Sequence, residues 1–267
     1  MLLAPDGALS GVPAAHAGRA DRAGDTRSRF AAVRNQLRAG PVGGGMGFTI
    51  GSTRTRTIRD LRSGARRRGR SPECTAVAEY TGLWGWDVVP GARTAAGACS
   101  CGRAGCPEPG AHPLDFAAPV RAGATLDEAY RAWAEFPGAA VMLPVGRAFD
   151  VIEVGEAAGW RALVRMERMG LPVGPVAVTP EGRAQFFVAP GGAAELPGLL
   201  YRMAWEDAAL DLRGLGVGAC ITAPPSDRAG RGVVRWLRAP GVEAGGVLPA
   251  ARLLIGTLAY VAHRSRV

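Results

Sequence analysis

Apolar residues recur at helical intervals in several stretches of this chain, and each stretch is predicted to form a helix. The clearest pattern follows Thr125 and Glu128, which form a capping box at the start of a predicted helix. The apolar stripe of that helix is Leu126, Ala129, Tyr130, Trp133 and Phe136. The other predicted helices begin near Pro72, cross Trp160 to Val164, and occupy Leu253 to Ala262.

Shorter apolar runs between these helices predict strands, because they are rich in Val, Ile and Phe and end at Gly or Pro. The predicted strands cover residues 86–89, 141–145, 149–154, 176–179, 185–188, 219–223 and 233–236. The turn from Pro180 to Gly182 joins two of them into a hairpin, and Pro224 to Ser226 lies between the last two. Helices and strands do not alternate strictly. This order indicates an α+β fold with a mixed or antiparallel sheet and helices packed on it.

The charge of the chain changes along its length. The 267 residues carry a net charge of +9, and all 32 basic residues are arginine. Residues 1–72 hold 14 Arg and 4 Asp, a charge of +10, whereas residues 73–267 hold 18 Arg and 19 acidic residues, a charge of −1. Positive charge suggests a nucleic-acid partner, but here it belongs to the N-terminal part. Two interpretations of that part remain, a solvated basic tail and an arm that clamps phosphate.

Composition divides the chain into three parts. Residues 1–45 are rich in Ala, Gly and Arg, and are expected to be disordered or to precede a true start at Met46. Residues 46–72 are predicted to be a basic linker, and residues 73–262 to be one folded domain. No secretory signal is recognisable, and the apolar run at 253–262 is about half the length that spans a bilayer. We therefore expect a cytoplasmic protein without a membrane anchor.

Zinc-type ligands are concentrated in residues 99–113, a segment rich in Gly and Pro. The ligands follow a C-x-C-x4-C-x5-H spacing and are Cys99, Cys101, Cys106 and His112. Zinc prefers a tetrahedron of thiolate and imidazole, so the spacing predicts a short structural zinc-binding loop. Unligated thiols or a redox pair remain the alternative. The chain has 5 cysteines, an odd number that argues against a disulfide framework, and Cys74 and Cys220 are predicted core thiols.

Four stretches carry a resemblance to a known family, and they come in that family's order. They are Gly85 to Pro90, Cys99 to Pro113, Asp211 to Gly214, and Ala223 to Ser226 with Gly230 after it. Together they resemble the bifunctional DNA primase/polymerase domain of the archaeo-eukaryotic primase superfamily. The resemblance implies a primase/polymerase-like fold with an RRM-type core, and DNA or nucleotides as partners. Replication or mobile-element proteins are the further partners that it implies.

The resemblance also implies a two-metal catalytic site, and this sequence departs from that site. Family members hold two Mg²⁺ or Mn²⁺ ions with an Asp-x-Asp pair on one strand and a separate Asp. Here Glu153 stands at the first position, Gly155 at the second and Asp211 at the third. Gln185 stands where the family offers a His to the incoming triphosphate. Asp150 lies three residues from Glu153, so it is expected on the opposite face of the strand. Catalysis is expected to be weak or absent.

Candidate contacts for nucleotide phosphates are Arg183, Arg213 and Ser226, with Arg228 as a further one. Three functions remain open at this point. The first is a family member that binds DNA or nucleotide without chemistry, which the altered catalytic positions favour. The second is an active DNA-dependent primase/polymerase that uses two divalent metal ions. The third is a zinc-stapled scaffold for a protein partner.

Overall fold

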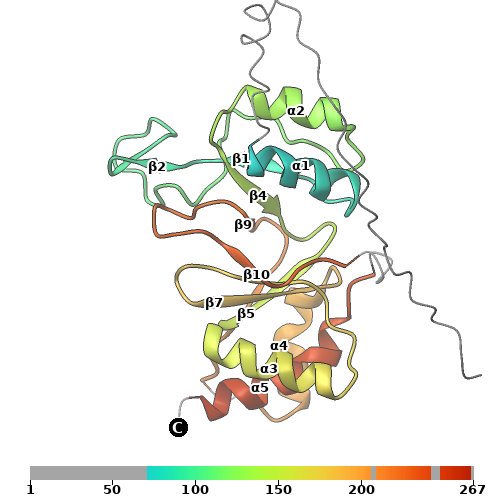
Figure 1. Ribbon diagram of the computed structural model, residues 1–267. Helices are drawn as coiled ribbons and strands as arrows, with labels where there is room; N and C mark the ends of the chain where they lie inside the picture. The colour runs from blue at the N-terminus through green and yellow to red at the C-terminus, as the bar shows by residue number, and fades with distance from the viewer. Residues whose placement is uncertain (1–70, 206–208, 242–246, 266–267) are drawn as a thin grey trace, which may run out of the picture. The chain divides into compact units, whose positions relative to one another are not determined.

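The computed structural model describes residues 71–205, 209–241 and 247–265 (Figure 1). The predictions for residues 1–45, and those for the linker up to residue 70, lie outside these described residues. The described part has an α+β fold with antiparallel sheets and packed helices, which confirms the fold class predicted from the sequence.

A five-stranded antiparallel sheet forms the centre of the described part. Its order is β10-β6-β7-β5-β8, with bounds Asp150–Gly155 for β5, Val176–Val178 for β6, Arg183–Val188 for β7, Leu212–Leu215 for β8 and Arg235–Arg238 for β10. In this register Glu153 of β5 pairs with Gln185 of β7 on one side and with Arg213 of β8 on the other. Directly paired residues point to the same face of a sheet, so these polar side chains stand together.

Three of the described helices pack on one face of this sheet (Figure 1). They are α3 (Glu156–Arg168), α4 (Gly192–Arg202) and α5 (Ala251–Arg264). Their buried side chains meet Ile152, Val154 and Phe186 of the sheet in one apolar cluster. Gly159 lets α3 approach closely, because a Cβ at this position would overlap the Cβ of Ala184. None of the described helices combines the length and the apolar character that crossing a bilayer requires.

The opposite face of the sheet packs against the N-terminal elements. These are α1 (Pro72–Gly82), α2 (Leu126–Ala134) and a three-stranded sheet of β1 (Val89–Gly91), β4 (Ala140–Pro144) and β9 (Cys220–Thr222). Trp86, Phe149 and Phe187 form the centre of this second cluster, with ring centroids 4.6 to 5.4 Å apart. Glu153 and Gln185 share this sheet face but lie beyond the apolar cluster. That end of the face is therefore left for polar side chains.

Several local predictions differ from the structure. The first predicted strand is displaced, since β1 begins at Val89 and contains Pro90, which an edge strand tolerates. The strands predicted at 219–223 and 233–236 are shorter or shifted and lie in different sheets, because β9 pairs with β4 and β10 pairs with β6. Helix α4 was not predicted, because two glycines at its start and Pro197 within it weaken the helical signal.

Candidate functional site

The predicted zinc ligands converge beside a short hairpin of β2 (Thr94–Ala95) and β3 (Ala98–Cys99). The ligand atoms of Cys99, Cys101, Cys106 and His112 all lie within 4.8 Å of one another. His112 Nε2 is 3.4 Å from Cys99 Sγ and 3.3 Å from Cys106 Sγ. Tetrahedral zinc, with bonds of about 2.0 to 2.3 Å, separates nitrogen and sulfur ligands by about 3.5 Å. The cluster is therefore compatible with a zinc site.

Hydrogen bonds prepare this cluster for a metal. His112 Nδ1 lies 2.7 Å from the carbonyl oxygen of Pro113, and donation of its N–H there leaves the Nε2 lone pair facing the sulfurs. Burial raises the pKa of the Cys99 thiol, but hydrogen bonds from Cys101 N–H, Gly110 N–H and His112 outweigh burial and lower this pKa to about 6. The thiolate is the form that binds metal, so the local geometry favours ligation.

The cysteine loop rests on the segment at residues 228–232. Ala229 N–H donates a hydrogen bond of 3.1 Å to the carbonyl oxygen of Gly110. Gly110 has a φ of +68°, and a Cβ there would lie 3.0 Å from Ala229 Cα, so only glycine permits this approach without strain. A metal held by the loop would therefore also fix the position of its neighbouring segment.

Glu153 is the centre of a second polar cluster, on the uncovered end of the sheet face. Its side chain is only 5% exposed. Oε1 accepts hydrogen bonds from Arg183 Nε at 3.2 Å and Arg213 Nη2 at 2.8 Å, and Oε2 accepts one from Gln185 Nε2 at 3.0 Å. Both carboxylate oxygens thus have charged or polar donors. Such pairing is what allows a carboxylate to be buried.

Arg183 links the two carboxylates that remain from the expected catalytic set. Its Nη1 donates to Asp211 Oδ2 at 2.6 Å, while its Nε donates to Glu153. Gly155 lies beside this bridge, because a Cβ there would be 3.1 Å from Asp211 Oδ2 and 3.9 Å from Arg183 Nη1. The hydrogen bond to Asp211 is the largest cause of a raised pKa for the Arg183 guanidinium, which therefore stays positively charged. One side-chain cation occupies the space between the carboxylates.

These residues do not fit the pair of divalent ions that the resemblance implies. Mg²⁺ and Mn²⁺ need carboxylate oxygens that are not committed to other cations. Oε1 of Glu153 already accepts from two guanidinium groups, Oε2 accepts from the Gln185 amide, and Gly155 offers no metal ligand at the second catalytic position. An ion between Glu153 and Asp211 would also meet the positive charge of Arg183 at the same oxygens.

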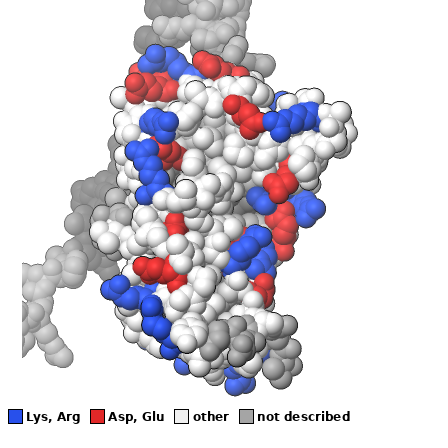
Figure 2. Space-filling view, turned by 180° about the vertical axis from the view of Figure 1, so that it is seen from behind, with Lys and Arg blue, Asp and Glu red and all other residues white. Residues whose placement is uncertain are grey.

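The Glu153 cluster opens into a cleft of about 580 Å³. The cysteine loop lines it through Pro107, Glu108, Pro109 and Ala111. Arg228 and Arg231 also line it and pair with Glu181 at 3.4 and 3.9 Å. Its charged lining residues balance, for they are Arg183, Arg213, Arg228, Arg231, Glu108, Glu153, Glu181 and Asp211. Basic and acidic side chains are also interspersed over the face in Figure 2. The cleft therefore presents no strong field of one sign.

The structure brings Glu153, Gln185, Asp211, Arg183 and Arg213 together, and it places Ser226 elsewhere. Ser226 is 2% exposed, and its Oγ accepts a hydrogen bond from Val141 N–H at 2.7 Å. This residue supports β4 and does not line the cleft, so it is not available to a phosphate.

Asp150 lies on the opposite sheet face, as its spacing predicts, and its Oδ2 accepts a hydrogen bond from Ala193 N–H at 2.9 Å. Sequence reasoning missed Glu181 and Arg231 as cleft residues. The signal for Glu181 was its place in the predicted turn directly before Arg183.

Residues 77–251 match the family model for the N-terminal domain of bifunctional DNA primase/polymerases. No curated protein and no solved structure matches the chain. The matched residues are more than half of the 267 in the chain, and they include the cysteine loop and the whole Glu153 cluster. The chain therefore belongs to the bifunctional DNA primase/polymerase family.

Proposed function

We propose that this chain binds DNA or nucleotides without joining them, as a family member whose metal position is filled by its own arginine. The observation that carries the proposal is the Arg183 guanidinium, which bridges Glu153 and Asp211 beside Gly155. Nucleotidyl transfer with two metal ions needs cations that contact both the attacking and the leaving oxygen. A guanidinium held by two protein carboxylates cannot take over that role, while the fold and the cleft remain available for binding.

The proposal includes a zinc ion in the cysteine loop, with a structural role. A site with four protein ligands has no open position for catalysis. Through the contact between Gly110 and Ala229, the zinc loop would keep the cleft wall at Pro107 to Ala111 in place. A reducing, cytoplasmic location is part of the proposal, and the free cysteines clustered with His112 support it. The proposed partners, replication or mobile-element proteins, rest on membership of the family alone.

The first test is nucleotide incorporation. Purified full chain and its Asp211→Ala variant are assayed for primer extension and for de novo primer synthesis on single-stranded DNA, with Mg²⁺ and with Mn²⁺. We expect no incorporation by either protein, and salt-sensitive DNA binding by both in fluorescence anisotropy. Incorporation that Asp211→Ala abolishes would show an active polymerase. If neither DNA nor nucleotide binds at low salt, the proposal is wrong and the zinc-stapled scaffold for a protein partner is the remaining function.

A second test addresses the arginine bridge without relying on activity. The double variant Gly155→Asp, Arg183→Gln places a third carboxylate beside Asp211 and removes the bridging cation. We expect Mn²⁺ to raise its melting temperature, because ligand binding stabilises by mass action, and we expect no such shift in the wild type. Gly155→Asp alone, which keeps Arg183, is the matched control. An equal Mn²⁺ shift in the wild type would mean that the cleft accepts a metal despite Arg183.

A further inference from the structure

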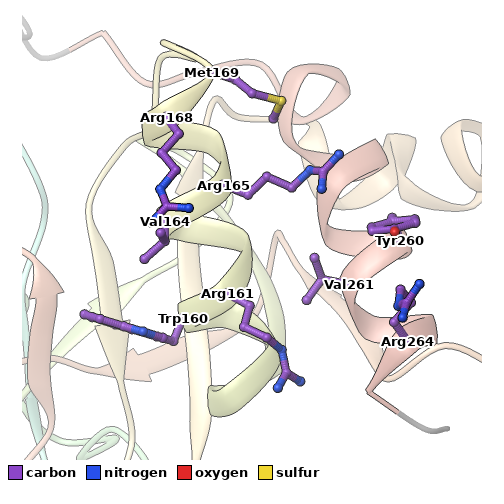
Figure 3. A pocket seen from close by; sticks show the side chains of 9 residues that line it. All are labelled: Trp160, Arg161, Val164, Arg165, Arg168, Met169, Tyr260, Val261 and Arg264. Atoms are coloured by element: carbon purple, nitrogen blue, oxygen red, sulfur yellow. The ribbon is translucent and has the colours of Figure 1, made fainter.

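Figure 3 shows a groove between α3 and α5. These helices cover the sheet face that carries Ile152 and Val154, whereas Glu153 points to the opposite face. The volume of the groove is about 730 Å³. Arg165 contacts Tyr260 and Arg161 contacts Ser265, so the two helices run antiparallel along the groove. The residues that line it are Trp160, Arg161, Val164, Arg165, Arg168, Met169, Tyr260, Val261 and Arg264.

The charge of this groove is of one sign. Its charged lining residues are Arg161, Arg165, Arg168 and Arg264, all exposed, and the lining includes no carboxylate. Over the described part of the chain, no carboxylate forms an ion pair with any of these arginines.

The acidic residues of α3 are engaged elsewhere. Glu156 pairs with Arg235, and Glu167 pairs with Arg238 at 2.8 Å. Both partners belong to β10. Because these carboxylates pair with β10, they do not neutralise the groove as the acidic residues of the cleft neutralise its arginines. The groove therefore keeps four positive charges, although residues 73–267 have a net charge close to zero.

Aromatic surface accompanies these charges. Trp160 is 54% exposed and Tyr260 is 41% exposed, although both are large apolar rings. Trp160, Val164 and Arg168 follow one another along one edge of α3, whereas Arg161, Arg165 and Met169 reach toward α5 (Figure 3). The Arg165 guanidinium carbon lies 5.1 Å from the centre of the Tyr260 ring. The groove thus offers flat rings and guanidinium planes side by side.

We propose that this groove binds a single-stranded nucleic acid, separately from the cleft. Surfaces that bind single strands combine cationic side chains, which contact phosphates, with aromatic side chains, on which unpaired bases stack. Arginine adds cation–π and phosphate contacts at the same place. An acidic peptide would use the charge but not the exposed rings, and residues 1–72, with a charge of +10, would be repelled. The inference rests on the proposed function only in that both require affinity for nucleic acid.

The test measures binding of labelled oligo-thymidylate to the full chain over a series of salt concentrations. Trp160→Ala is expected to weaken binding roughly 5-fold or more through lost stacking, and Trp160→Phe to retain most of the affinity. Arg165→Gln with Arg168→Gln should flatten the slope of log affinity against log salt by about 1.4, since two phosphate contacts are lost. The matched control, Arg131→Gln with Arg252→Gln, removes two exposed arginines outside the groove and should change the slope less.

The outcomes separate the two proposals. If the groove variants bind like the control pair while the wild type binds oligo-thymidylate, the groove is not the site and the proposed function stands. If the wild type does not bind at low salt, both proposals fail for nucleic acid. If poly-glutamate competes as strongly as the oligonucleotide and its binding is also lost in Trp160→Ala, the groove recognises acidic chains, and its assignment to nucleic acid is overturned.

Discussion

Glu153 keeps a carboxylate in a nearly buried position because protein side chains take the place of water around it. Arg183, Arg213 and Gln185 supply its donors, and all of them come from strands that neighbour β5. A buried ion pair gains less than its Coulomb energy suggests, yet removing one partner is costly because the remaining charge stays buried. Removing the Arg183 side chain should therefore lower the free energy of unfolding.

Arg183→Met is expected to lower the free energy of unfolding by about 1 to 3 kcal/mol, because Glu153 and Asp211 lose a shared donor. Arg147→Met is the matched control, since Arg147 also pairs with a carboxylate, Asp87, that keeps a second arginine. The Arg147 side chain is 76% exposed, so its loss should cost about 0.2 to 1 kcal/mol. Urea unfolding of both variants makes the comparison. Equal losses would show that the Arg183 bridge behaves as a surface pair.

The raised pKa values of two buried groups, the Cys220 thiol and the Tyr80 phenol, predict how the stability of the protein depends on pH. Burial raises the pKa of the Cys220 thiol from 9.0 to about 12, and burial also raises the pKa of Tyr80, against an opposing hydrogen bond with Trp236. Above pH 9 the unfolded chain releases protons that the folded chain retains, so stability should fall as the pH rises from 9 to 12. Urea unfolding at several alkaline pH values checks this. Tyr80→Phe should decline less steeply above pH 10, and a decline parallel to the wild type would contradict the role of Tyr80.

At the scale of single residues, the sequence predicted positions better than contacts. Glu153 and Gln185 were assigned to the site by resemblance, and the strands that carry them were predicted from their apolar residues. The Arg183 bridge depends on the register of β5 against β7 and on a side-chain conformation, which no local pattern encodes. Ser226 lies in a stretch that resembles the family and was predicted to contact phosphate. In the structure, the hydroxyl of Ser226 instead accepts a hydrogen bond from the backbone N–H of Val141.

Helix packing depends on glycines that look alike in the sequence and differ in their surroundings. Gly159 in α3 is buried against β7, where a Cβ would overlap Ala184, whereas a Cβ at Gly198 in α4 would meet nothing within 4 Å. Gly159→Ala should therefore destabilise the protein by about 1 to 3 kcal/mol through overpacking. Gly198→Ala should stabilise it by about 0.5 to 1 kcal/mol through helix propensity. Melting temperatures that move in the same direction would contradict this account.

The same contrast explains which elements the sequence predicted. Helix α2 carries its signal locally, since Thr125 Oγ1 accepts a hydrogen bond from Glu128 N–H at 3.3 Å and Glu128 accepts one from Thr125 N–H at 2.8 Å. Helix α4 has glycine at its N-cap and contains Pro197, so its stability comes from packing on the sheet and from the distant Asp150, which accepts from Ala193 N–H. The partners of β9 and β10 are likewise set by long-range packing, which a turn between them cannot reveal.

For the described domain as a whole, one sheet separates two apolar cores. The cysteine loop contributes to neither core, and its contacts lead to the cleft side through Gly110 and Ala229. The groove between α3 and α5 lies on the other core. Metal loss or substitution in the cysteine loop should therefore alter the cleft and leave the groove between α3 and α5 unchanged.

Zinc removal tests this separation. We expect one zinc per chain by atomic absorption, retained in Cys74→Ser and lost in Cys106→Ser, because Cys74 is outside the ligand cluster. After chelation, hydrogen exchange should accelerate at residues 99–113 and 228–232, while α3 and α5 keep their protection. Exchange that accelerates equally in α5 would mean that the metal stabilises the entire domain.

The Arg183 bridge also removes the need for a free divalent cation to neutralise Glu153 and Asp211. A metal ion held by carboxylates exchanges with solvent, and its occupancy follows the free concentration of that ion. A guanidinium on β7 is covalently attached, so its supply to Glu153 and Asp211 does not depend on the concentration of a free ion. In the proposed binding module, the charge balance of these two carboxylates would therefore not vary with the cell's supply of divalent cations.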